Sequence, residues 1–282
     1  MSQRTLILGA VAYDPKVVTI WDGFQEYFAE RGLPFDYVLY TNYERQVGAH
    51  LAGHIDVAWN SPLAWLETER LAARAGRRAE AIAMRDSDRD LTSTILVSAG
   101  GPIRTIADLR GRRVAAGAAD SPQATLIPLQ VIAEHGLGPG RDFEVLLFDL
   151  LPGKHGDHIG GERDAARALV KGEADAACIL DANYSLFVQE GTLPAGAVRS
   201  IAQTPVFDHC NFTVLDDGPK EELARFRELL LGMSYADPQV RRLLDLEGLK
   251  QWLPGRTEGY ALLATAADRD GYLEKAIAGI AP

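Results

Sequence analysis

Residues 51–72 read LAGHIDVAWNSPLAWLETERLA, and this stretch contains the strand-to-helix unit on which the fold depends. The apolar run over 55–59 is typical of a buried strand. Ser61 and Pro62 follow that run, and these residue types are preferred at the N-cap and at the first position of a helix. The stretch therefore predicts a strand over 55–59 and a helix over 62–75.

Similar units recur along most of the chain. Strands are expected over 5–8, 35–40, 55–59, 79–84, 94–98, 113–116, 143–148, 174–180, 198–202 and 211–214. Helices are expected over 15–31, 43–52, 62–75, 122–135, 163–171 and 182–189, and the pattern after residue 220 is mostly helical. This alternation of strands and helices predicts an α/β protein with largely parallel sheets.

Three of the predicted strands end in the same kind of turn, VAYDP at 11–15, WNSP at 59–62 and ADSP at 119–122. Asp14, Ser61 and Ser121 are the expected N-caps, each followed by a proline. Helix starts offer unpaired N–H groups and partial positive charge beyond the carboxyl ends of the strands. We therefore expect an anion site, with Ser61 and Ser121 nearer to the ligand than the negatively charged Asp14.

The composition argues against several classes of function. A net charge of −10 over 282 residues is unlike that of a protein that binds nucleic acid or an anionic membrane surface. The two cysteines cannot form a disulfide framework. No stretch approaches the ~20 apolar residues that membrane insertion requires. Motifs for nucleotide hydrolysis, dinucleotide binding, zinc proteolysis and α/β-hydrolase catalysis are absent, and we expect no cofactor.

Three stretches together resemble the phosphonate/phosphite substrate-binding proteins of ABC transporters: the one quoted above, residues 95–137 and residues 160–184. The strongest pieces are DLRGRRVA at 108–115 and the segment before Pro122. The resemblance implies a type II periplasmic-binding-protein fold, in which two α/β lobes are joined by two crossing strands and hold a ligand in a cleft. The lobes implied here are 1–93 with 184–282, and 94–183.

The resemblance also implies which residues bind the ligand. Carried over by position, they are Tyr13, Asn60, Ser61, Ser93, Thr94, Ser121, Gln123, Ala124, Thr125, Asp181, Asn183 and Tyr184. The family usually has a histidine just before the helix over 163–171, whereas this chain reads Gly161-Glu162-Arg163 there. His155 and His158 lie upstream in a glycine-rich loop, from which we expect His158 to contact the ligand and no metal to be bound.

Two functions remain open at this stage. The first is a substrate-binding protein that closes on a small phosphonate-like or carboxylate-like anion, with an ABC permease as partner if it is exported. The second is a cytoplasmic lyase, decarboxylase or cofactor-biosynthesis enzyme on the same scaffold, using His155, His158, Asp181 and Cys210 for catalysis. The first residues lack the features of a signal peptide, which predicts a cytoplasmic protein unless a signal peptide has been removed.

Several other residues have a structural interpretation. Arg85 could clamp an oxyanion, but the charged run over 85–90 is more typical of a solvated turn. His209 and Cys210 could form a base and a nucleophile, but neighbours in a strand point to opposite faces, so we expect no pair and a buried Cys210. Cys178 is expected in the core. His50 is expected at the surface or at a helix cap.

Overall fold

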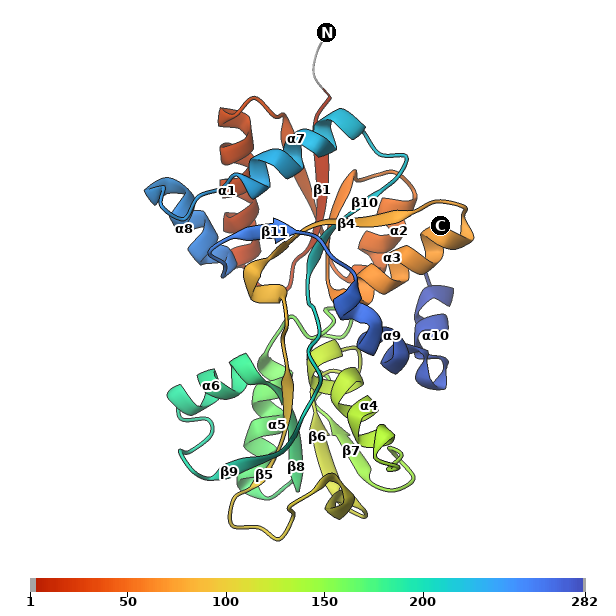
Figure 1. The fold of residues 1–282 in the computed structure, drawn as a ribbon, viewed down its shortest axis with the longest axis vertical. Helices are drawn as coiled ribbons and strands as arrows, with labels where there is room; N and C mark the ends of the chain where they lie inside the picture. The colour runs from red at the N-terminus through yellow and green to blue at the C-terminus, as the bar shows by residue number, and fades with distance from the viewer. Residues whose placement is uncertain (1–3, 281–282) are drawn as a thin grey trace. The chain divides into compact units, whose positions relative to one another are not determined.

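The computed structural model describes residues 4–280, which divide into two compact units. Unit 1 consists of the chain up to residue 89, residues 208–261 and residues from 270, and unit 2 consists of 90–207 and 262–269 (Figure 1). The second boundary differs from the expected 183/184. The reason is that β9 (Val198–Gln203) pairs with β5 (Ser93–Ser98), which keeps this part of the chain in unit 2.

Unit 1 is built on a six-stranded mixed sheet. Its strands are β1 (Leu6–Val11), β2 (Phe35–Tyr40), β3 (Val57–Asn60), β4 (Ala79–Arg85), β10 (Asn211–Leu215) and β11 (Trp252–Pro254), in the order β11-β4-β10-β3-β1-β2. The first three are parallel to one another, and β10 runs antiparallel to both β3 and β4. The carboxyl end of β3 therefore lies beside the amino end of β10, with Asn60 paired to Asn211.

Helices cover both faces of the unit 1 sheet (Figure 1). One face packs against α1 (Lys16–Glu30), α7 (Lys220–Leu231) and α8 (Pro238–Glu247). The other packs against α2 (Tyr43–Leu51) and α3 (Pro62–Arg74), and α10 (Tyr272–Ala278) packs on α3. The core of the first face is aromatic, because the Phe212 ring contacts Trp21, Trp59, Phe226 and Trp252. Trp59 and Trp65 are both buried.

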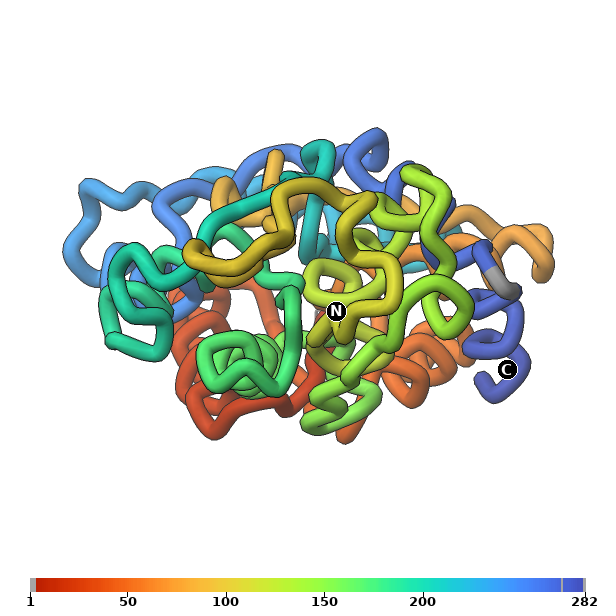
Figure 2. The backbone as a smooth tube through the Cα atoms, turned by 90° about the horizontal axis from the view of Figure 1, so that it is seen from below, coloured from red at the N-terminus to blue at the C-terminus, as the bar shows by residue number. Residues whose placement is uncertain are grey.

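Unit 2 is built on a five-stranded sheet. Its strands are β5, β6 (Arg113–Ala116), β7 (Glu144–Leu147), β8 (Ala176–Leu180) and β9, in the order β7-β6-β8-β5-β9. One face packs against α4 (Ile127–Glu134) and the other against α5 (Gly160–Lys171) and α6 (Asp181–Gln189) (Figure 1 and Figure 2). The helix α9 (Ala261–Asp268) also belongs to this unit. The predicted α/β class is confirmed, but the sheets are mixed rather than largely parallel, because β4, β10 and β11 in unit 1 and β5 in unit 2 pair antiparallel.

Two of the three predicted helix starts form as expected. The Ser61 hydroxyl accepts a hydrogen bond from Ala64 N (3.1 Å) at the start of α3. The Ser121 hydroxyl accepts one from Ala124 N (3.2 Å) at the start of η3 (Pro122–Leu126), a π-helical turn that continues into α4. At the third, α1 begins at Lys16, one residue later than predicted, but Asp14 Oδ1 still caps this helix start by accepting a hydrogen bond from Lys16 N (2.9 Å).

No helix within residues 4–280 combines the length and the apolar character that crossing a bilayer requires.

His50 is buried in unit 1, which corrects the expectation of a surface or capping residue. It lies near the end of α2 and lines a cavity of about 100 Å³ together with Arg77, Asp56 and Asp217. Burial lowers the pKa of His50 to about 4, and the nearby Arg77 guanidinium acts in the same direction, while Asp56 and Asp217 oppose it. The folded protein therefore holds this ring neutral over a pH range in which the unfolded chain protonates it.

This burial predicts a pH-dependent stability. Between pH 6.5 and pH 4 the unfolded chain binds a proton at His50 that the folded chain does not, so the free energy of unfolding falls as the pH falls, by about 3 kcal/mol in total. Urea unfolding can be followed by tryptophan fluorescence, because all four tryptophans lie in unit 1. We expect His50→Leu to flatten this part of the pH profile. An unchanged slope in the variant would contradict the assignment.

Candidate functional site

In unit 1, the predicted ligand residue Asn60 belongs to a buried chain of hydrogen bonds. Its side-chain oxygen accepts a bond from Gln46 Nε2 (2.8 Å), and its amide nitrogen donates to Thr213 Oγ1 (2.9 Å) and Thr68 Oγ1 (3.3 Å). The chain continues through Asn211. Asn60 is fully buried, so its side chain holds β3, β10, α2 and α3 together and positions the start of α3 beside it.

The same chain of hydrogen bonds ends at the segment before β10. Asn211 Nδ2 donates to the Tyr260 hydroxyl (2.9 Å), which donates to the carbonyl oxygen of His209 (2.9 Å). Tyr13, the other predicted ligand residue of this edge, is partly exposed after β1, with Lys16 Nζ 5.8 Å from its ring centroid. These hydrogen bonds therefore fix the end of β3 from which Ser61 follows, and Tyr13 lies beyond the end of the neighbouring parallel strand β1.

Arg85 forms a buried ion-pair cluster, which corrects the expectation of a solvated turn. Its guanidinium donates to both carboxylate oxygens of Asp88 (2.5 and 2.9 Å) and to Glu247 Oε1 (3.2 Å), and it lies 5.2 Å from the Trp59 ring centroid. Burial alone would raise the pKa of Asp88, but the charge of Arg85 and hydrogen bonds from Arg85 and His209 lower it to about 2. Arg85 is therefore held by carboxylates of its own chain.

His209 and Cys210 approach each other, contrary to expectation. His209 Nδ1 lies 3.1 Å from Cys210 Sγ and 3.6 Å from Asp88 Oδ1. The expectation of opposite faces assumed a strand at these positions, but β10 begins at Asn211, so the alternation of a strand does not apply. The expected burial of Cys210 and Cys178 is confirmed, and burial raises the pKa of the Cys178 thiol to about 12.

In unit 2, the start of η3 is covered by the loop that contains the two histidines. A Cβ atom at Gly156 would lie 2.3 Å from Ser121 Oγ, so only glycine allows the loop to lie this close. Gln123 Nε2 donates to the carbonyl oxygen of Gly156 (2.9 Å). His155 is buried, whereas His158 is partly exposed and its Nδ1 accepts a bond from Gly160 N (3.2 Å).

Glu162 occupies a central position that the interpretation of the sequence did not assign to the site. It is buried in the first turn of α5, and its Oε2 accepts hydrogen bonds from Leu180 N (3.0 Å) and Asn183 Nδ2 (3.0 Å). Its Oε1 lies 3.5 Å from Gln123 Nε2. The signal in the sequence that could have indicated this position was an acidic residue at the start of a predicted helix.

Four of the predicted residues are therefore joined by contacts around this helix start. Ser93 belongs to the group, because its hydroxyl donates to the carbonyl oxygen of Gln123 (2.7 Å). The four residues are Ser93, Ser121, Gln123 and Asn183, and Ala124 lies in the same turn as Gln123.

Four other predicted residues of unit 2 have different surroundings. Thr94 donates to Ser200 Oγ (2.6 Å) on β9, and Thr125 donates to the carbonyl oxygen of Ala118 (2.7 Å). Asp181 accepts hydrogen bonds from Thr92, just before β5, and from Gln203, the last residue of β9. Tyr184 is partly buried against the core between α5 and the sheet.

Carboxylates surround the start of η3. Asp149 Oδ1 accepts a hydrogen bond from Ala119 N (3.1 Å), and Asp120 Oδ2 accepts one from Gly153 N (2.5 Å). The second oxygen of Asp120, Oδ1, is buried and has no hydrogen-bond partner among the described residues. A buried acceptor without a donor is costly, so this oxygen favours a ligand that brings a donor.

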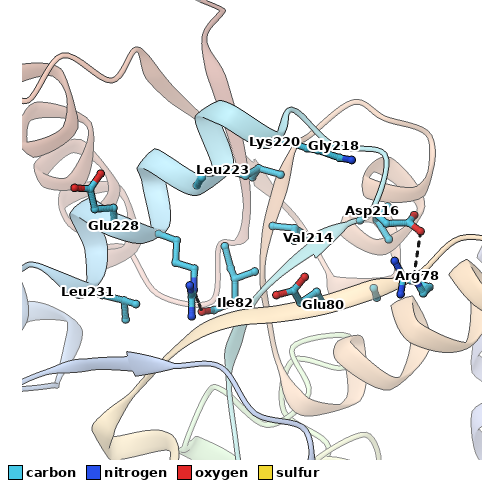
Figure 3. Close-up of a pocket in the computed structure, with 14 residues that line it drawn as sticks. Arg78, Glu80, Ile82, Val214, Asp216, Gly218, Lys220, Leu223, Glu228 and Leu231 are labelled. Carbon is cyan, nitrogen blue, oxygen red and sulfur yellow. Dashed lines mark hydrogen bonds and ion pairs between the residues drawn. The ribbon is translucent and has the colours of Figure 1, made fainter.

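A large groove of unit 1 lies at the end of the sheet away from the carboxyl end of β3. It has a volume of about 750 Å³ and runs between α7 and the ends of β4 and β10 marked by Ala79 and Leu215 (Figure 3). Arg78 pairs with Asp216 across one end of the groove (Figure 3). Arg227 donates to the carbonyl oxygen of Ile82. Ser61 follows the carboxyl end of β3, so this groove and the candidate ligand residues of unit 1 lie at opposite ends of the strands.

Comparison with known proteins decides the family. A family model described as the periplasmic phosphonate substrate-binding protein of ABC transporters matches residues 10–260. The chain belongs to this family. It is therefore a substrate-binding protein, the first of the two functions that the sequence left open.

Solved structures support the same fold. PhnD1 from Prochlorococcus marinus (MIT 9301) in complex with methylphosphonate has a TM-score of 0.69 at 15% identity, with 95% of this chain and 98% of that chain covered. A Xanthomonas citri protein bound to ATP gives 0.71 at 16%, covering 99% and 100%. The aliphatic sulphonate binding protein SsuA from Escherichia coli gives 0.60 at 18%, covering 97% and 88%. The expected type II periplasmic-binding-protein fold is confirmed.

Proposed function

We propose that this protein binds a small singly charged oxyanion of the alkylphosphonate type and delivers it to an ABC permease. The observation that carries the proposal is the pair of serine-capped helix starts, Ser61 after β3 and Ser121 after β6, one in each unit. The family match supports a ligand of this kind, and the structurally similar PhnD1 is a methylphosphonate complex.

The chemistry of the caps suits an oxyanion. Each serine oxygen accepts a hydrogen bond from a backbone N–H of its own helix, and a hydroxyl also carries one proton that it can donate. Helix starts add backbone donors and partial positive charge. An anion can bind at these caps without a lysine or an arginine. The guanidinium of Arg85 is already paired with Asp88 and Glu247.

The loop over Ser121 is the element that must yield to a ligand. Leu151 and His155 both adopt positive φ angles, 58° and 49°, which are unfavourable for residues other than glycine. The covering position of the loop therefore costs conformational energy. A ligand that takes the place of Gly156 over Ser121 would release part of this strain.

The unpartnered oxygen of Asp120 selects among oxyanions. A phosphonate monoanion keeps one P–O–H group that can donate to Asp120 Oδ1, whereas a sulfonate has no such proton. A doubly charged phosphonate would lose this donor and meet repulsion from Asp120 and Asp149. We therefore expect phosphonate monoanions to bind more tightly than sulfonates with the same alkyl group.

A thermal-shift panel tests this function. The panel contains methylphosphonate, methanesulfonate, phosphate, acetate and a neutral amide, each at several pH values. We expect the largest increase in Tm with methylphosphonate, a smaller one with methanesulfonate, and a methylphosphonate effect that weakens as pH rises through its second ionisation. Asp120→Asn should remove the preference for phosphonate over sulfonate. Stabilisation by the neutral amide alone would contradict an oxyanion ligand.

A further inference from the structure

Three metal-ligating side chains lie together at the two segments by which the chain leaves unit 1. Asp88 ends the short helix η1 (Asp86–Asp88) after β4, and His209 and Cys210 immediately precede β10. The backbone joins the two segments, because His209 N donates to the carbonyl oxygen of Asp88 (2.8 Å). We call Asp88, His209 and Cys210 the connector cluster.

The geometry of the connector cluster fits a small divalent ion. One oxygen, one nitrogen and one sulfur atom from the three residues all lie within 4.8 Å of one another. His209 Nδ1 is 3.1 Å from the sulfur and 3.6 Å from Asp88 Oδ1. Tetrahedral Zn²⁺ with bonds of about 2.0–2.3 Å places its ligand atoms about 3.3–3.6 Å apart. The separation of 3.6 Å from the oxygen falls within this range, and the separation of 3.1 Å from the sulfur falls just short of it.

Burial and orientation also suit a metal site. Asp88 is 2% exposed, Cys210 3% and His209 9%. Arg85 donates to both oxygens of Asp88 and fixes the carboxylate, as second-sphere donors do for ligating carboxylates. A carboxylate oxygen has two lone pairs, so Asp88 Oδ1 can accept from Arg85 and bind an ion at once.

The local charges agree with this interpretation. With Cys210 as a thiolate, the cluster and its neighbour Glu247 carry three negative charges, and Arg85 supplies one positive charge. A divalent ion would make the group neutral, which matters in a buried place. The combination of thiolate, imidazole and carboxylate donors is typical of zinc and related borderline-soft ions rather than of Mg²⁺ or Ca²⁺.

We propose that Asp88, His209 and Cys210 form a Zn²⁺ site that ties together the two connecting segments of unit 1. Three protein ligands leave the fourth position of a tetrahedral ion for water. The site uses none of the residues assigned to the oxyanion, so either proposal can fail without the other.

Cobalt(II) is the probe for the test, because its bond to a thiolate gives an absorption band that identifies a cysteine ligand. The full-length reduced protein is titrated with Co²⁺ and then with Zn²⁺. We expect a thiolate-to-cobalt band that saturates at one equivalent and disappears when Zn²⁺ displaces the cobalt. Loss of the thiol in Cys210→Ser should abolish the band, and His209→Gln should weaken Co²⁺ binding by about 100-fold or more.

Cys178→Ser is the matched control, because Cys178 is the second cysteine of the chain and lies in the core of unit 2. It should keep the band at full intensity. Absence of the band in the wild-type protein, whose folding is not in question, would overturn the proposal. So would a band that persists in Cys210→Ser, or one that Cys178→Ser removes.

Discussion

Ser121→Asp should weaken oxyanion binding by about 1000-fold while leaving the protein folded. Aspartate caps a helix as well as serine does, so the bond from Ala124 N to residue 121 can be kept. The new carboxylate removes the hydroxyl donor and places a negative charge where we propose that the ligand is bound. A like charge at close range in a buried place costs several kcal/mol. Isothermal titration calorimetry with methylphosphonate measures the loss.

Ser121→Asn is the matched control. Asparagine has nearly the same size as aspartate and is an equally good N-cap, so it disturbs the nearby Gly156 loop to the same extent but adds no charge. We expect it to lose far less affinity than Ser121→Asp. Equal losses in the two variants would show that crowding matters rather than charge, and unchanged binding in both would remove Ser121 from the site. The Ser61→Asp and Ser61→Asn pair tests unit 1 in the same way.

Arg85→Met should destabilise unit 1 by about 3–5 kcal/mol, because it leaves two buried carboxylates without their counter-charge. The side chains of Asp88 and Glu247 are only 3% and 4% exposed. The contact of the guanidinium with the Trp59 ring is lost as well. The midpoint of urea unfolding, followed by tryptophan fluorescence, measures the effect.

Arg78→Met is the control for this prediction. Arg78 also forms an ion pair with an aspartate, Asp216, but its side chain is 87% exposed. Water and salt screen such a pair, so the variant should change the free energy of unfolding by less than about 1 kcal/mol. If both variants had equally small effects, the Arg85 cluster would not be the buried network described here.

Local features of the site could be predicted from the sequence, because they depend on neighbouring residues. Ser61 and Ser121 cap their helices as expected, since the cap bond spans only three residues. The burial of Cys178 also followed from its apolar strand. At Asp14 the predicted capping contact also forms, to Lys16 N, although α1 begins one residue later than expected.

Long-range partners could not be predicted in this way. Arg85 and Glu247 are 162 positions apart, so nothing local distinguishes a buried ion pair from a solvated turn. Glu162 meets Asn183 and Leu180 only when α5 packs on β8. His209 and Cys210 lie just before β10 and outside the strand, and the position at which β10 begins depends on its pairing with β3 and β4. The candidate ligand residues remain predictions until binding is measured.

The central claim is that this substrate-binding protein holds a phosphonate-type oxyanion, and a calorimetric titration of the wild-type protein with methylphosphonate tests it most directly. The account predicts a saturable isotherm with one site and a Kd of about 1 μM or lower, which corresponds to about −8 kcal/mol. Absence of saturable binding of methylphosphonate at millimolar concentration, in protein shown to be folded and free of copurified ligand, would contradict it.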